Sequence, residues 1–160
     1  MNFLVPADVP GRRITAFAWQ ATALFSVTAI LAAISSSSSL RVVAVVVALV
    51  LFAAGMIVFL IAYLRAIGRS RYEVVSVAGV YLMTGGVAPT RVRRSLYGAL
   101  VAQIVVALVT ASVRPYTSLA FGVLVPLLGL ALCGLWSARH GEFPRRPQVT
   151  AERDDAEEPG

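Results

Sequence analysis

The chain has 160 residues, of which 58% are hydrophobic and only 14% are charged, and its mean hydropathy is +0.80. A water-soluble domain of this size needs a polar shell, which so few charged side chains cannot supply. The composition therefore excludes an ordinary soluble domain and predicts an integral membrane protein.

The first predicted pair of membrane spans covers residues 14–64. The apolar segment Ile14–Ile34 has 21 residues and would be about 31 Å long as a helix, which matches a hydrocarbon core of about 30 Å. A second apolar segment, Val42–Leu64, lies between two arginines. An arginine pair before the first segment is also a feature of export signals, but this segment is longer than a usual signal core. We therefore expect an uncleaved helical hairpin.

Residues 65–95 form the longest predicted loop. Within it, the 16 residues of Val74–Pro89 would reach only about 24 Å as a helix, which is short for a span. The segments 72–77 and 80–83 are rich in β-branched and aromatic residues, which favours either a short β-hairpin or one interfacial element. Because an isolated hairpin is marginal in water, we expect this loop to lie against the membrane surface or a partner.

The second predicted hairpin covers residues 96–136. Two apolar segments of 18 residues each, Leu96–Val113 and Leu119–Trp136, are separated by a short turn that contains Pro115. Pro126 is expected to kink the last helix. Residues 137–160 are basic near the membrane and acidic at the end, which predicts a disordered tail.

The distribution of arginine predicts the topology. All 14 basic residues are arginine, and four spans put twelve of them on one side, with Arg41 and Arg114 on the other. A fifth span through residues 74–89 would leave 8 against 6. Because positive residues collect on the cytoplasmic side, we expect four transmembrane helices, with the N-terminus (1–13), the loop and the tail all in the cytoplasm.

The arginines next to the membrane are candidate contacts with anionic lipid headgroups or with a partner protein. A pI near 10.4 would suggest nucleic acid in a soluble protein, but here the arginines flank apolar segments, so nucleic acid is not an expected partner. The candidates in the loop are Arg69, Arg71, Arg91, Arg93 and Arg94.

Polar and small residues within the spans are candidate contacts between helices. An amide side chain at membrane depth forms hydrogen bonds to another helix, and small residues allow close approach of two backbones. The candidates are Gln20, Gln103, Gly98, Ala102 and Gly129.

Catalytic chemistry is poorly represented. No Asp, Glu, Lys, Arg or His lies in any of the four spans, whereas proton-coupled carriers normally keep an ionisable group at membrane depth. The single histidine, His140, and the single cysteine, Cys133, give no cluster for a metal. Glu73 follows Arg69 by four residues and is expected to form a local ion pair. We therefore expect neither an enzyme nor a cofactor or metal site.

Several short segments of the second half resemble small, uncharacterised four-span membrane proteins of actinobacteria. These segments are Gly86-Val87-Ala88-Pro89, Arg93-Arg94-Ser95-Leu96, Ser112-Val113-Arg114-Pro115-Tyr116 and Ala138-Arg139-His140-Gly141. The resemblance covers about half of the chain and implies a location in a bacterial plasma membrane, but no activity.

Two hypotheses for function follow from these patterns. The first is a non-catalytic accessory or scaffold subunit of a larger plasma-membrane complex, because the spans carry no ionisable groups and the loop is too apolar to stand free. The alternative is a small transporter or channel with a polar, uncharged path. Four spans are too few to enclose much of a path, so the alternative requires a homo-oligomer.

Overall fold

The computed structural model describes residues 11–35, 37–74, 76–113 and 118–144. The helices in these ranges are α1 (Arg12–Ile34), α2 (Ser38–Arg69), α3 (Val77–Tyr81), α4 (Thr90–Val113), the 3-10 helix η1 (Ser118–Leu124) and α5 (Pro126–His140). Four helical segments, α1, α2, α4 and the stretch Ala120–His140, are long and apolar enough to cross a membrane. The prediction of a helical chain with four candidate spans is thereby confirmed.

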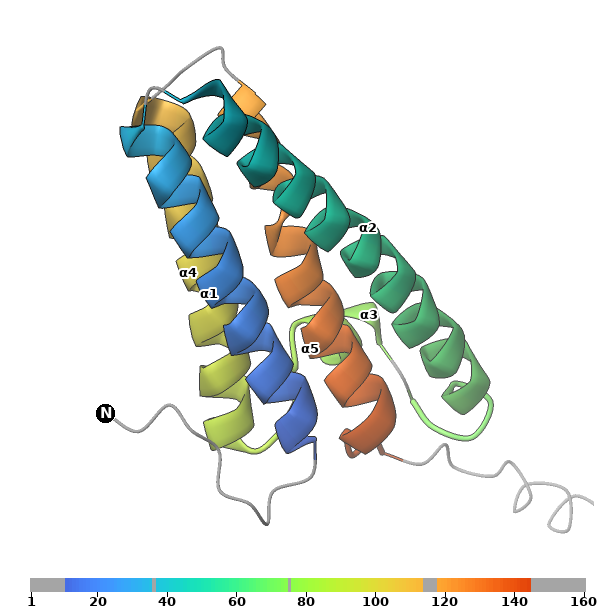
Figure 1. The fold of residues 1–160 in the computed structure, drawn as a ribbon. Coiled ribbons are helices and arrows are strands. Elements are labelled where there is room, and N and C mark those ends of the chain that lie inside the picture. The colour runs from blue at the N-terminus through green and yellow to red at the C-terminus, as the bar shows by residue number, and fades with distance from the viewer. Residues whose placement is uncertain (1–10, 36, 75, 114–117, 145–160) are drawn as a thin grey trace, which may run out of the picture.

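The helices form a bundle with α5 near its centre (Figure 1). α2 packs mainly on α5 and η1, and α1 packs mainly on α4, so the largest contacts join the two halves of the chain. α1 and α4 run in the same direction, and the ends of α2 and α5 lie at the same end of the bundle as the starts of α1 and α4 (Figure 1). That end carries nine of the described arginines, whereas Arg41 lies at the other. We call it the arginine-rich end.

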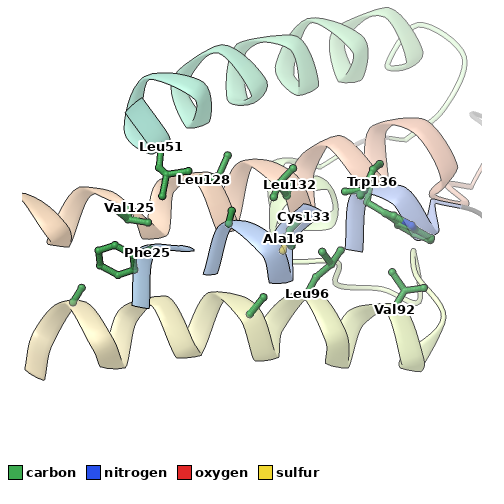
Figure 2. Close-up of a cluster of buried hydrophobic side chains, with 14 of the residues drawn as sticks. Ala18, Phe25, Leu51, Val92, Leu96, Val125, Leu128, Leu132, Cys133 and Trp136 are labelled. Carbon is green, nitrogen blue, oxygen red and sulfur yellow. The ribbon is translucent and has the colours of Figure 1, made fainter. Parts of the chain in front are cut away.

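Large side chains from the helices fill the centre of the bundle. Phe25 of α1, Leu96 of α4 and Trp136 of α5 are almost completely buried (Figure 2). Leu128 and Leu132 of α5 join them, as does Val125 just before α5. α2 contributes mostly small residues to the interior, namely Ala44, Ala48, Gly55, Ala62 and Ala66, together with Leu51. Its valines, isoleucines and leucines lie mostly on the outside. Small residues inside and large apolar residues outside are the pattern of a helix that packs in lipid.

The close packing of α2 on α5 depends on Gly55. A Cβ atom at this position would lie 2.9 Å from the backbone nitrogen of Leu128 and 3.0 Å from its Cα. Backbone atoms cannot move aside as a flexible side chain does, so only glycine permits this distance between the two helices.

Pro126 interrupts the last apolar segment, as expected from the sequence. It occupies the first turn of α5, where a missing N–H has no helical acceptor to lose. The preceding residues form the 3-10 helix η1, and the Val125 N–H donates to the Gly122 carbonyl at 3.1 Å. The segment is therefore a short 3-10 helix followed by an α-helix.

The predicted loop contains a helix where the sequence favoured strands. Residues 77–81 form α3, and in the described part of the loop no β-hairpin is present, so that alternative is wrong. Gly79, Val80 and Tyr81 are buried, which means the segment is not simply laid on a surface. In apolar surroundings, a helical turn satisfies its own backbone groups, whereas a two-stranded hairpin leaves its edges unpaired. Tertiary packing thus overrides the local preference for strand.

The predicted turn at 114–118 falls largely outside the described residues, as do the N-terminal residues up to 10 and the part of the tail from residue 145. The start of the predicted disordered tail, residues 137–140, is instead the end of α5, because Ser137 and Ala138 are buried in the bundle. The bounds of the helices otherwise extend beyond the predicted spans mainly at the arginine-rich end. α2 continues to Arg69 and α5 to His140, while α4 already begins at Thr90.

Candidate functional site at the arginine-rich end

Arg69 joins three parts of the chain at the end of α2. Its Nε donates to Oε2 of Glu73 at 2.9 Å, and its Nη2 lies 2.8 Å from the same oxygen. Its Nη1 donates to the Ala138 carbonyl at 3.3 Å and its Nη2 to the Gly141 carbonyl at 2.9 Å. A guanidinium group has donors in a fixed plane and can serve several acceptors at once, and here two acceptors belong to the end of α5.

The Arg69 side chain therefore joins the end of α2 to the end of α5. The ion pair expected for Glu73 is confirmed, and the guanidinium also lies 5.0 Å from the centre of the Phe143 ring. With its donors committed to Glu73 and to two carbonyls, Arg69 is a weaker candidate for a lipid or partner contact than the exposed arginines around it.

A second group of arginines lies at the starts of the two parallel helices, α1 and α4. Arg12 and Arg13 start α1, and Arg91, Arg93 and Arg94 lie in the first turns of α4. All are exposed except Arg93, which is half-buried. We call these five residues the α1–α4 arginine face. The N-terminus of a helix carries a partial positive charge, so neither helix offsets the guanidinium charges.

Two hydrogen bonds fix α1 against α4. The indole N–H of Trp19 donates to the Ser95 hydroxyl at 3.0 Å, and Nε2 of Gln103 donates to the Thr22 hydroxyl at 2.9 Å. Trp19 and Ser95 both lie within two turns of the starts of their helices. The five arginines consequently lie at the same end and at similar depth. No described carboxylate forms an ion pair with any of them.

The predicted helix contacts fall into two groups. Gln103 is fully buried and reaches α1, and Gly129 lies against it, since a Cβ at residue 129 would be 2.7 Å from Oε1 of Gln103. Gly98 accommodates the ring of Trp19, and Ala102 is half-buried. Gln20, by contrast, is exposed on the outside of α1.

α3 inserts beside α5 on the side that faces α2 (Figure 1). The Tyr81 ring stacks on Phe59 with centroids 4.4 Å apart, and its hydroxyl donates to the Phe59 carbonyl at 3.1 Å. A Cβ at Gly134 of α5 would collide with the same ring. Phe59 precedes Arg65 by six residues, so Tyr81 lies about 9 Å along α2 from that arginine, toward the middle of the bundle.

The backbone of this inserted segment is satisfied locally. The Ser76 hydroxyl accepts from the Gly79 N–H at 2.9 Å, and the Leu82 N–H donates to the Ala78 carbonyl at 2.9 Å. The Tyr97 hydroxyl of α4 donates to the Leu82 carbonyl. Burial raises the pKa of Tyr81 above its usual value of 10.0, and the nearby Tyr63 raises it further. The phenol therefore stays protonated at neutral pH and remains a donor to Phe59.

The described residues include few side chains of the types that bind metals. Among them, no group of three or more His, Cys, Asp and Glu side chains could hold a metal ion. The hydroxyls of Thr22, Thr28 and Thr110 donate to carbonyls one turn earlier in their own helices. Each of these hydroxyl protons is thus donated within its own helix, and the Thr22 oxygen also accepts from Gln103 of α4.

Sequence reasoning missed three features of this end: the bonds from Arg69 to α5, the insertion of α3, and the pairing of Trp19 with Ser95. Each joins residues far apart in the chain. Glycines 55 and 134 gave a faint signal, because glycine inside an apolar helix usually has a packing reason. No protein-family model matches the chain, and no curated protein or solved structure is significantly similar to it.

Proposed function

We propose that the chain is a non-catalytic accessory or scaffold subunit of a larger complex in a bacterial plasma membrane. In this proposal it crosses the membrane four times, with both termini and the arginine-rich end in the cytoplasm. The α1–α4 arginine face is its docking surface, for anionic lipid headgroups together with an acidic partner protein.

The observation that carries the proposal is the contrast between Arg69 and this face. Arg69 is bonded to Glu73 and to two carbonyls of the chain. The five arginines that begin α1 and α4 form no ion pair with a described carboxylate. A concentrated positive surface next to a membrane attracts anionic groups, and each exposed arginine contributes about 1 kcal/mol with anionic lipid.

The polar side chains of the spans also support a scaffold more than a path. Gln103 is used to join α1 and α4, and Gln20 lies on the outside of α1. A scaffold needs contacts of this kind within the bundle and a polar group available to a neighbouring helix.

The test is gentle purification from native membranes, with the particle size measured and its components identified by mass spectrometry. We expect a larger partner at a fixed ratio. A variant with Arg91→Gln and Arg94→Gln should lower the affinity for that partner by roughly thirtyfold, since it removes two contacts of about 1 kcal/mol each.

The matched control carries Arg65→Gln and Arg139→Gln. It also removes two exposed arginines from the arginine-rich end, so both variants weaken the charge bias for orientation equally. The control should retain the partner. Particles that contain only this chain would contradict the accessory role.

A second candidate function, a small oligomeric transporter or channel, is favoured by one specific observation. The last span is divided at Pro126 and α3 inserts into the bundle, and interrupted helices and re-entrant segments are common in transport proteins. Purified chain in sealed vesicles would then conduct or exchange an uncharged solute. Vesicles that are no more permeable than protein-free vesicles to a panel of small neutral solutes would count against this candidate.

A further inference from the structure

A cavity of about 210 Å³ separates the end of α2 from α3. Tyr63, Ala66, Ile67 and Ser70 of α2 form one wall, and Val77, Val80 and Tyr81 of α3 form the other. The cavity lies where α3 packs closely on α5 and meets α2 through side chains such as Tyr81, which stacks on Phe59.

The chemistry of the walls favours an apolar occupant. The Ser70 hydroxyl donates to the Ile67 carbonyl at 2.7 Å, and the Tyr81 hydroxyl donates to the Phe59 carbonyl. Both hydroxyls therefore have acceptors within the chain, and the remaining walls are aliphatic or aromatic apart from the hydroxyl of the exposed Tyr63. An apolar cavity of about 150 Å³ is already large enough to bind benzene, so this one can hold a segment of hydrocarbon chain.

The cavity is continuous with the outer surface of α2. Leu60, Tyr63, Leu64 and Ile67 are all exposed, and their spacing of three and four residues places them in one stripe along the helix. Two of these residues, Tyr63 and Ile67, also line the cavity. In a membrane this stripe faces acyl chains, so the occupant reaches the cavity from the bilayer and not from water.

A positive group lies where the stripe ends. Arg71 follows Ser70 directly, is exposed, and forms no ion pair with a described carboxylate, whereas Arg69 is paired with Glu73. We propose that the cavity binds an acyl chain of an anionic phospholipid, whose phosphate contacts Arg71. The lipid fills the space between α2 and the inserted α3. This site is separate from the α1–α4 arginine face and does not depend on the proposed docking function.

Photo-crosslinking tests the site. The full chain is placed in vesicles that contain phosphatidylglycerol with a diazirine in its acyl chain, and labelled peptides are identified by mass spectrometry. Residues 63–81 should be labelled at least about fivefold more than the exposed residues of α2 near Val50, a ratio equivalent to about 1 kcal/mol. With phosphatidylcholine carrying the same diazirine, the labelling should be weaker.

Three variants make the test specific. Val77 is 69% exposed, so Val77→Trp can occupy the cavity from the α3 side without creating a void, and it should abolish the excess labelling of Tyr63 and Ile67. Val50→Trp adds the same side chain on the distant outer face of α2 and should change nothing. Arg71→Gln should lower the preference for phosphatidylglycerol over phosphatidylcholine by about fivefold.

Uniform labelling along α2 would overturn the proposal, because it would indicate ordinary boundary lipid. Excess labelling that survives Val77→Trp would overturn it as well. Ile67→Trp fills the cavity from the α2 side and controls for misfolding of Val77→Trp. The proposal requires that Val77→Trp and Ile67→Trp each abolish the excess labelling. A preference for phosphatidylglycerol that persists in Arg71→Gln would contradict the phosphate contact.

Discussion

Arg69 shows how one side chain can connect the ends of two helices in a bundle that has few polar residues. Its donors reach Glu73 four residues later and two carbonyls at the end of α5. The sequence allowed the ion pair to be predicted, because a spacing of four residues brings the two side chains together. The bonds to Ala138 and Gly141 could not be predicted, since they require the ends of α2 and α5 to meet.

Replacing Arg69 should therefore loosen the end of the bundle. We expect Arg69→Gln to lower the free energy of unfolding by about 1–3 kcal/mol, through loss of charge-assisted hydrogen bonds that are partly shielded from water. Arg69→Lys should recover only part of the loss, because an ammonium group cannot reproduce the planar fork. Thermal unfolding in detergent micelles measures both effects.

Arg65 provides the comparison for this prediction. It lies one turn before Arg69 on α2 and is exposed. Arg65→Gln should change the stability by less than about 0.5 kcal/mol. Equal losses for the two variants would mean that the bonds of Arg69 contribute nothing beyond its charge.

At the scale of helices and loops, hydropathy and charge predicted which segments form helices long and apolar enough to cross a membrane, because both are properties of the local sequence. The insertion of α3 was not predictable in this way. Residues 72–83 are rich in β-branched and aromatic types, yet Tyr81 fits between Phe59 and Gly134, which come from helices distant in sequence. The helical form of this segment depends on that fit. The need for glycine at residue 55 depends in the same way on a residue far away in the sequence, Leu128.

Two glycines of α2 offer a matched pair for the packing of α2 on α5. Gly55→Ala places a methyl group against the backbone of Leu128 and should destabilise the protein by about 1–3 kcal/mol. A Cβ atom at Gly68 would meet no neighbouring atom within 4 Å, so Gly68→Ala should be neutral or stabilise by up to about 1 kcal/mol. The same unfolding measurement compares them, and a Gly55→Ala protein as stable as Gly68→Ala would refute the close approach.

The insertion of α3 has its own test in Gly134. A methyl group at this position would push against the Tyr81 ring, so Gly134→Ala should release α3 from α5. Hydrogen exchange should then become faster at the amides of Val80 and Leu82, which donate within the segment. Exchange at the same two amides should stay slow in Gly68→Ala. No difference between the variants would show that Tyr81 does not hold α3 in place.

At the scale of the whole molecule, the distribution of side chains fits a membrane better than water. Large apolar residues cover the outside of α2, small ones lie inside, and nine described arginines gather at one end. In the proposed topology that end lies in the cytoplasm, as the positive-inside rule predicts. The segment that links α2 to α4 begins and ends at the arginine-rich end (Figure 1). The proposed four-span topology therefore predicts residues 71 and 91 on the same side of the membrane.

The most direct test of a four-span chain with a cytoplasmic arginine-rich end is cysteine accessibility in intact cells and in inverted vesicles. The native Cys133 is fully buried, so the unmodified chain serves as the unlabelled reference. Arg71→Cys and Arg91→Cys should both react with a membrane-impermeant maleimide only in inverted vesicles, whereas Ser39→Cys should react only in intact cells. Labelling of Arg71→Cys and Arg91→Cys from opposite sides would contradict the four-span topology, since it would mean that residues 74–89 cross the membrane as a fifth span.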